Sequence, residues 1–307
     1  MDIDFLLWIE KLRCGFLTAF MSIITNAGYD IAAIGITCLV YWCFNRKTGN
    51  RLLLTMLFSL GLNQLLKLAF AAQRPWDKSS KLHTIESAKE DAGGYSFPSG
   101  HTSNAAALYL GLSHGKQVKL IWKILAWVLV ILVAFSRLYL GVHTPQDVIF
   151  GLLLSLVVIF VMDKVCEKLD QNPRFDIAVC TAALAISLAA LLLVLFRRFP
   201  GSSDTVKANR IDAIKFVSAT VGIAVGWLLE RRFIKFEKPA NLWFALFRVV
   251  VGLALVFALL EGTKPPLTTL LGEYAGGAIR YLAACFAAVW LWPLLFTRIE
   301  TRFAKGK

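Results

Sequence analysis

The sequence predicts an all-α, polytopic membrane protein. Of its 307 residues, 57% are hydrophobic and only 17% are charged, whereas soluble domains average about 25% charged residues. The apolar residues are also grouped into runs that approach the roughly 20 residues a helix needs to cross a bilayer. A low charge content and long apolar runs together favour helices that lie in lipid over a water-soluble core.

These runs predict about nine spanning helices. They lie at residues 28–44, 51–72, 102–114, 119–137, 147–163, 176–197, 211–234, 241–260 and 276–297. The preceding segment, residues 1–27, starts with acids among large apolar residues, which favours an amphipathic interfacial helix over a cleavable signal peptide. A polar stretch at 163–176 divides the rest into a core at 28–175 and an extension at 176–307.

The formal net charge is +13, and the lysines and arginines are spread over short loops. Nucleic acid is therefore not an expected partner, because its binding needs basic residues gathered on one element. The basic residues are most frequent in the loops at 45–51, 114–123, 163–175, 231–238 and 298–307. This bias predicts that these loops face the cytoplasm. The opposite loops, 71–99 and 137–147, should then face the periplasm or the exterior of the plasma membrane.

Two other features are assigned ordinary roles. The six cysteines are scattered, with no C-x-x-C pair, which is typical of small buried hydrophobic residues rather than of a disulfide framework or a zinc site. The connection at 197–210 is basic and is interpreted as a solvated loop that meets lipid head groups. Its basic residues are Arg197, Arg198, Lys207 and Arg210.

The first of three polar clusters on the outer side holds two cations near the end of an apolar helix. Lys67 lies close to that end, and Arg74 follows just beyond it, before Pro75. A lysine at this depth either extends its ammonium group to the interface or serves a function. No acid nearby in the sequence neutralises both cations, so a shared anion is expected, and arginine suits two phosphate oxygens at once.

The second cluster, "GGYSFPSGHTSN" at residues 93–104, runs from small residues straight into a helix. A helix N-terminus has free N–H groups and a positive dipole end, which together form an anion site. Ser99 can instead cap the helix, and the two interpretations are compatible. Gly100 allows the backbone to approach a ligand closely, and His101 then lies at the edge of the site.

The third cluster joins two helices on the same side. Arg137 ends one helix, His143 follows in a short loop, and Asp147 opens the next helix. A carboxylate beside an imidazole fixes its tautomer and raises its basicity. The alternative is that Asp147 only caps a helix and that His143 is an ordinary loop residue.

Together the clusters contain the groups that phosphoryl transfer through a histidine needs. Cations hold the equatorial oxygens of the phosphoryl group. One histidine attacks phosphorus, and the other protonates the leaving oxygen.

At these residues the sequence closely resembles the type 2 phosphatidic acid phosphatase superfamily, which also includes the vanadium haloperoxidases and glucose-6-phosphatase. The family pattern is K-x6-R-P, then P-S-G-H, then S-R-x5-H-x3-D. Every position matches in the correct order, over roughly residues 50–163. The matching residues are Lys67, Arg74, Pro75, Pro98, Ser99, Gly100, His101, Ser136, Arg137, His143 and Asp147.

This resemblance implies a role for eight of the matched residues. His143 would be the nucleophile that forms a phosphohistidine, Asp147 would orient it, and His101 would be the general acid. The residues that would bind the phosphate are Lys67, Arg74, Ser99, Gly100 and Arg137. Neither a metal nor another cofactor is implied, and the chain has no metal-ligand cluster of its own.

The resemblance also implies a six-helix phosphatase core, followed here by about four additional helices. The expected activity is hydrolysis of a lipid phosphate or pyrophosphate at the outer membrane face. Candidate substrates are phosphatidic acid, undecaprenyl pyrophosphate, phosphatidylglycerophosphate and a sphingoid-base phosphate.

Two alternative functions stay open. A phosphotransferase would pass the phosphate to another lipid, and a lipid transporter or scramblase would use Arg248 and Arg280 inside the apolar helices of the extension. For the extension itself, three roles stay open. It would shape a lipid entrance, form the interface of a homodimer, or bind a second ligand.

Overall fold

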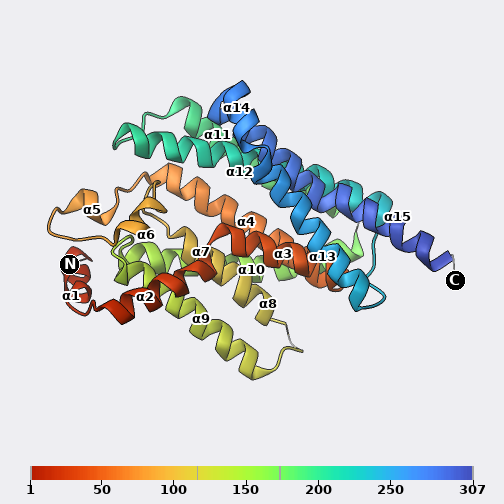
Figure 1. Ribbon diagram of the computed structural model, residues 1–307, viewed down its shortest axis with the longest axis horizontal. Coiled ribbons are helices and arrows are strands. Elements are labelled where there is room, and N and C mark those ends of the chain that lie inside the picture. The colour runs from red at the N-terminus through yellow and green to blue at the C-terminus, as the bar shows by residue number, and fades with distance from the viewer. Residues whose placement is uncertain (1, 116, 173, 306–307) are drawn as a thin grey trace. The chain divides into compact units, whose positions relative to one another are not determined.

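The computed structural model describes residues 2–115, 117–172 and 174–305, and these residues form helices joined by short connections, with no strand among them (Figure 1). The all-α prediction is therefore confirmed for this part of the chain. Two lysines of the basic loops, Lys116 and Lys307, lie outside the described residues.

The first ten helices lie between Asp2 and Gln171. They are α1 (Asp2–Glu10), α2 (Gly15–Ile24), α3 (Asp30–Cys43), α4 (Arg46–Phe70), α5 (Pro75–Lys78), α6 (Glu86–Glu90), α7 (Gly100–Ala105), α8 (Gly111–Ser113), α9 (Leu120–Tyr139) and α10 (Pro145–Gln171). A 3₁₀ turn, Thr25–Gly28, follows α2, and a π-helical turn, Ala106–Leu110, links α7 to α8.

Five more helices follow. They are α11 (Phe175–Phe196), α12 (Ser203–Leu229), α13 (Leu242–Phe257), α14 (Lys264–Phe286) and α15 (Trp292–Lys305). The helices α12, α13 and α14 each end in a π-helical turn, at Glu230–Ile234, Ala258–Gly262 and Ala287–Leu291.

Among the described residues, seven helices are long and apolar enough to cross a membrane, or eight if a bent pair forms one span. That pair joins Gly15–Gly28 to Asp30–Cys43 at 46°. The sequence predicted about nine spans because residues 28–44 and 102–114 were each counted as one. The first is α3, which has 14 residues. The second is broken by the π-helical turn and buries polar side chains from Thr102 to Asn104 inside the protein.

The described residues fall into two compact units. The first takes its residues from Met1–Ile34, Leu54–Asp163 and Leu193–Asn209, and the second from Gly35–Leu53, Lys164–Leu192 and Arg210–Lys307. This division follows spatial packing, so it does not test the sequence boundaries at 27 and 175, which stay a prediction.

In the first unit, α9 lies alongside α2 and α7 (Figure 1). Ala105 and Ala106, at the junction of α7 and its π-helical turn, are buried with Val130 and Val133 of α9. Because alanine side chains are short, α7 and α9 can approach closely. This packing holds the start of α7 and the end of α9, where two of the three polar clusters lie, within one unit.

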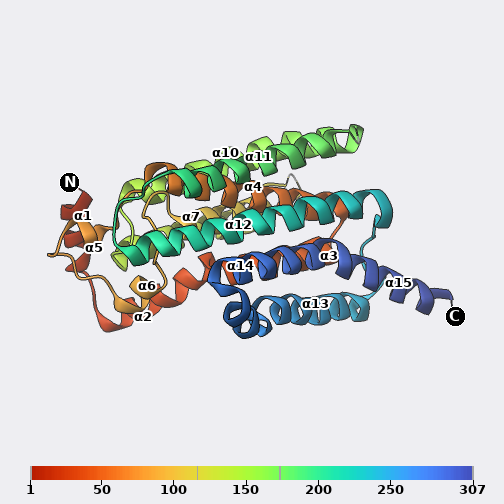
Figure 2. The same cartoon turned by 90° about the horizontal axis from the view of Figure 1, so that it is seen from above.

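In the second unit, α13 lies alongside α14 and α15 (Figure 2). Arg248 of α13 is buried, yet it donates to both carboxylate oxygens of Glu300 at 2.7 Å and to the Trp42 carbonyl at 2.7 Å. Arg280 donates to the Leu260 carbonyl at 2.7 Å and lies 3.7 Å from Glu261. A buried arginine needs such partners, so the two arginines that would support a transporter are explained by packing within the second unit.

Close packing of α12 against α14 depends on Gly222. A Cβ atom at this position would lie 2.5 Å from the Leu282 carbonyl oxygen and 3.1 Å from the Phe286 amide nitrogen. Both are backbone atoms, which cannot turn aside as a flexible side chain would. By contrast, a Cβ at Gly35 of α3 would meet nothing within 4 Å.

We predict that Gly222→Ala lowers the melting temperature of the detergent-solubilised protein, because overpacking a tight interface costs about 1–3 kcal/mol. The control Gly35→Ala should keep or raise the melting temperature, since alanine favours a helix over glycine by about 0.5–1 kcal/mol. Equal melting temperatures for the two variants would contradict the packing argument.

Candidate functional site

All eight predicted site residues lie in the first unit. Lys67 is in the last turn of α4, and Arg74 directly precedes α5. Ser99, Gly100 and His101 form the start of α7. Arg137 lies near the end of α9, His143 lies in the turn after it, and Asp147 is in the first turn of α10. The three sequence clusters therefore lie at the ends of helices in one compact unit.

Arg74 links two of these helix ends. Its guanidinium is buried; Nε donates to the Gly94 carbonyl at 2.7 Å, and Nη1 donates to the Val142 carbonyl at 2.9 Å. Nη1 also lies 3.0 Å from Nε2 of His143. An arginine can only donate, so Nε2 must accept. His143 therefore carries its proton on Nδ1, and its Nε2 lone pair points at the guanidinium.

Asp147 faces the other nitrogen of the same imidazole. Its Oδ2 lies 3.5 Å from Nδ1 of His143, which is longer than a good hydrogen bond. The same oxygen accepts from Ser96 Oγ at 2.5 Å and from the Thr144 amide at 2.8 Å. Ser96 and Thr144 thus hold the buried carboxylate beside the imidazole.

Asp147 also caps α10, as the alternative interpretation required. The amide of Asp147 donates to Thr144 Oγ1 at 3.4 Å, while its carboxylate accepts from the Thr144 amide. This reciprocal pair is a capping box. One side chain therefore both starts the helix and faces His143, so the two interpretations do not exclude each other.

Ser99 caps α7. Its Oγ accepts from Thr102 Oγ1 at 3.0 Å and more weakly from the Thr102 amide at 3.5 Å. The Ser99 amide donates to the carbonyl of Asp147 at 2.9 Å, which ties the start of α7 to the start of α10. A Cβ at Gly100 would lie 3.7 Å from Nζ of Lys67. The ammonium group of Lys67 is therefore close to the start of α7.

The imidazole of His101 packs against the ring of Tyr29, and one of its nitrogens has no hydrogen-bond partner among the described residues. The ring of Tyr29 lies edge-on at 4.7 Å between ring centroids, and the Tyr29 hydroxyl donates to Asp91. Nε2 of His101 is buried and has no hydrogen-bond partner among the described residues. A buried nitrogen without a partner is costly, which suits a group whose partner is a ligand.

Arg137 is buried at the end of α9. Its Nη1 donates to Thr25 Oγ1 at 2.7 Å, and its backbone carbonyl accepts from the Val142 amide at 3.1 Å. Its Nε is buried and has no partner among the described residues. A guanidinium N–H is therefore left for an oxygen that the protein itself does not supply.

Burial keeps both site histidines neutral near pH 7. It lowers the pKa of His143 below its ordinary value, and the nearby charge of Arg74 lowers that pKa further. Burial likewise lowers the pKa of His101, with Arg137 as the next contributor. Because the imidazoles are neutral beside two guanidinium groups, the site is electropositive and favours an anion.

Sequence reasoning missed three residues of this site. Thr144 had a usable signal, because a threonine three positions before an acid at a helix start is a capping box. Ser96 and Tyr29 had none, since their contacts join positions that are far apart in the chain.

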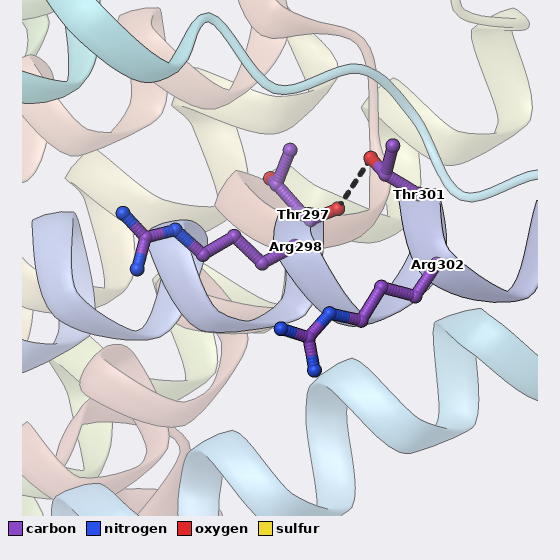
Figure 3. A pocket seen from close by; sticks show the side chains of 4 residues that line it. All are labelled: Thr297, Arg298, Thr301 and Arg302. Carbon is purple, nitrogen blue, oxygen red and sulfur yellow. Dashed lines mark hydrogen bonds between the residues drawn. The ribbon is translucent and has the colours of Figure 1, made fainter.

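Neither a metal-ligand cluster nor the pocket on α15 provides a second site among the described residues. Among the described residues, no three His, Cys, Asp or Glu side chains gather as metal ligands would. A pocket of about 360 Å³ is lined by Thr297, Arg298, Thr301 and Arg302 of α15, with Thr301 Oγ1 donating to the Thr297 carbonyl at 2.7 Å (Figure 3). Three of these side chains are exposed, which is typical of a solvated helix end.

Comparison with known proteins agrees with the arrangement of the clusters. The PAP2 superfamily model matches residues 48–169, and the model of the PAP2 superfamily phosphatase transmembrane extension matches residues 214–305. An undecaprenyl-diphosphatase of Sulfolobus acidocaldarius is 31% identical over 147 residues, covering 47% of this chain and 68% of that protein. The chain belongs to the PAP2 superfamily.

Other PAP2 proteins are similar over part of their length. Phosphatidylglycerophosphatase B of Bacillus subtilis is 34% identical over 139 residues, covering 42% of this chain and 64% of that protein. The match therefore spans less than two thirds of that relative. The crystal structure of a transmembrane PAP2 type phosphatidylglycerolphosphate phosphatase from B. subtilis has 30% sequence identity and a TM-score of 0.43, covering 54% of this chain and 85% of that chain.

We predict that His143 is neutral, with its proton on Nδ1, at about pH 6. The imidazole should take up a second proton only as the pH falls well below 6.5, because burial and Arg74 lower its folded-state pKa. Nitrogen-15 NMR of histidine-labelled protein in detergent, assigned with His143→Gln, measures both protonation and tautomer. A folded-state pKa at or above that of the denatured chain would contradict this prediction.

Proposed function

We propose that the protein is an integral membrane phosphatase that hydrolyses a lipid phosphate or diphosphate through a phosphohistidine on His143. The environment of this one imidazole carries the proposal. Nδ1 faces Asp147 at 3.5 Å, while the lone pair of Nε2 points to Arg74 Nη1 at 3.0 Å. A nucleophilic nitrogen and a phosphate-binding cation therefore lie side by side.

The phosphoryl group binds among the cations of the site. Arg74 and Arg137 donate to its oxygens, and the unpartnered Nε of Arg137 supports this role. Lys67, the Ser99 hydroxyl and the Gly100 amide complete the binding site. Hydrogen bonds to charged donors in a buried site are short and strong, and they stabilise the charge that spreads over the equatorial oxygens in the transition state.

In the first step, Nε2 of His143 attacks phosphorus and forms a P–N bond while the bond from phosphorus to the leaving oxygen breaks. The bound phosphate anion favours the charged form of His101, so in the complex His101 is protonated and gives its Nε2 proton to that oxygen. The lipid leaves as an alcohol or a monophosphate. The imidazole of His143 becomes positively charged, and Asp147 stabilises that charge and keeps the ring oriented.

In the second step, water attacks the phosphohistidine. His101, now neutral, takes a proton from the attacking water as the P–N bond breaks. Inorganic phosphate is released, the electron pair of the broken bond returns to Nε2 of His143, and His101 is protonated again. The two histidines thus return to their starting states after each turnover.

A lipid is the proposed substrate because the chain has membrane-spanning helices and because its relatives act on lipids by name. These relatives include a phosphatidylglycerophosphatase and an undecaprenyl-diphosphatase. The bias of basic residues toward the opposite loops supports a site on the periplasmic or exterior side of the plasma membrane. Phosphatidic acid, phosphatidylglycerophosphate, undecaprenyl pyrophosphate and sphingosine-1-phosphate are the substrates to compare.

We predict that the purified protein releases phosphate from at least one of these lipids in the presence of EDTA. His143→Ala should lower kcat at least about 10³-fold, because the nucleophile is lost. The matched control is His114→Ala, since His114 also pairs with a carboxylate, Asp163, at 2.8 Å but lies outside the predicted site. It should keep the parent activity.

The same assay distinguishes the competing outcomes. Radioactive phosphate bound to the protein by a bond that is stable in base but hydrolysed in acid identifies the phosphohistidine, which should be absent from His143→Ala. Turnover that requires a second lipid as acceptor would indicate a transferase. A parent without phosphate release, or a fully active His143→Ala variant, would overturn the proposed hydrolysis.

We also predict a difference between the pH profiles of kcat and kcat/KM. The fall of kcat on the alkaline side should occur at a higher pH than the corresponding fall of kcat/KM, and this fall is the basic limb of each profile. The kcat/KM profile reports the free enzyme, in which burial and Arg137 lower the pKa of His101. A bound phosphate anion favours the charged imidazole and raises that pKa in the complex, so His101 keeps its catalytic proton to a higher pH. His101→Asn should lose this limb, and coincident limbs in the parent would contradict the role of His101.

A further inference from the structure

The connection between α11 and α12 lies outside both family matches. The PAP2 model ends at residue 169, and the transmembrane-extension model begins at residue 214. Nevertheless, Leu193–Asn209 belongs to the same compact unit as the predicted phosphate site. We call residues 197–209 the α11–α12 connection; it comprises the loop after α11 and the first two turns of α12.

Asn209 of this connection is buried against the segment that holds Arg74. Its Oδ1 accepts from the Tyr95 amide at 3.1 Å, and its Nδ2 donates to the Thr205 carbonyl at 2.7 Å. These two bonds define which way the carboxamide points. The carbonyl of the same peptide group, that of Gly94, accepts from Arg74 Nε at 2.7 Å. Asn209 and Arg74 therefore bind opposite sides of one peptide group.

The fit at this point leaves no spare space. A Cβ atom at Gly94 would lie 2.9 Å from Oδ1 of Asn209, so the glycine lets the asparagine approach the backbone. The hydroxyl of Tyr95 also donates to the Pro200 carbonyl at 2.7 Å, and its ring lies 6.0 Å from that of Phe199. The Gly94–Tyr95 segment is therefore held by both ends of the connection.

Arg197 holds a second part of the site. Its Nη1 donates to the Leu68 carbonyl at 2.5 Å and also to the Ala69 carbonyl. These are among the last carbonyls of α4, which have no partner within the helix, and a cationic side chain is a suitable donor to them. Ala71, just beyond, has a φ of 47°, in the left-handed region that alanine disfavours. Lys67 lies in the turn that Arg197 supports.

We propose that two residues of the α11–α12 connection support the active site: Asn209 is a positioning residue for Arg74, and Arg197 is a positioning residue for the end of α4 that carries Lys67. This proposal rests on the proposed function for its catalytic meaning. The sequence favoured a solvated loop that meets lipid head groups. The contacts of Arg197 and Asn209 instead point into the protein, whereas Arg198 is exposed.

The test of Asn209 uses two variants and one control. Asn209→Leu keeps a similar volume but removes the acceptor for the Tyr95 amide, whereas Asn209→Asp keeps an acceptor. The control Asn241→Leu removes another asparagine that accepts a backbone amide, that of Phe244 at the start of α13. It lowers helix stability without touching the phosphate site.

Two readouts separate positioning from stability. Nitrogen-15 NMR measures the pKa of His143, and inhibition by inorganic phosphate measures binding at the site. In Asn209→Leu we expect the pKa of His143 to rise, because a displaced Arg74 no longer lowers it, and phosphate inhibition to weaken about 10- to 100-fold. Asn209→Asp should restore most of the phosphate inhibition, and Asn241→Leu should match the parent in both readouts.

Arg197 is tested in parallel, in case Asn209→Leu does not fold. Arg197→Gln should weaken phosphate inhibition and lower kcat/KM, whereas the neighbouring Arg198→Gln, which removes the same charge, should match the parent. Parent-like values in both Asn209→Leu and Arg197→Gln would overturn the inference. A parent that releases no phosphate would sink only the proposed function, because the His143 titration still decides whether Asn209 positions Arg74.

Discussion

The buried guanidinium of Arg74 is the constraint on which the arrangement of the site depends. A buried charge must be surrounded by fixed dipoles or by an opposite charge. Arg74 finds two carbonyls, those of Gly94 and Val142, and one imidazole nitrogen, that of His143. All three are neutral acceptors, so the segments that supply them are held together while the positive charge is left for an anion. The same side chain thereby organises the fold around the predicted site and favours an anionic ligand there.

Glycines make the second constraint, because the three helix ends must meet closely. A Cβ at Gly28 would lie 2.8 Å from the His101 carbonyl oxygen, and a Cβ at Gly151 would lie 2.8 Å from the Ser99 carbonyl oxygen. The start of α7 is therefore packed between the 3₁₀ turn after α2 and the first turns of α10. Neither glycine belongs to the family motif, yet each allows a motif residue to occupy its place. Close packing of this kind keeps Ser99 and His101 in one position with few alternatives.

The sequence predicted the all-α fold and brought all eight predicted site residues into consideration, because apolar runs and motif spacing are local signals. It overcounted the spans, since a hydrophobic stretch such as 102–114 has the same composition whether it lies in lipid or inside the protein. It also missed Ser96, Tyr29 and Asn209. Their contacts with Asp147, His101 and Tyr95 join distant positions, and no spacing rule within a single chain indicates which distant residues will meet.

The sequence favoured a solvated loop for the α11–α12 connection because no local pattern marks its contacts with the site. Its contacts with the site go largely through backbone atoms: the Tyr95 amide, and the carbonyls of Leu68 and Ala69. Backbone groups are present at every position, so such bonds leave no characteristic residue on the receiving side. A segment outside the family motifs needs only a few such bonds to influence a site in its own unit. Through Arg197 and Asn209, the α11–α12 connection has a physical route to the two cations, Lys67 and Arg74, that the predicted chemistry places on the phosphate.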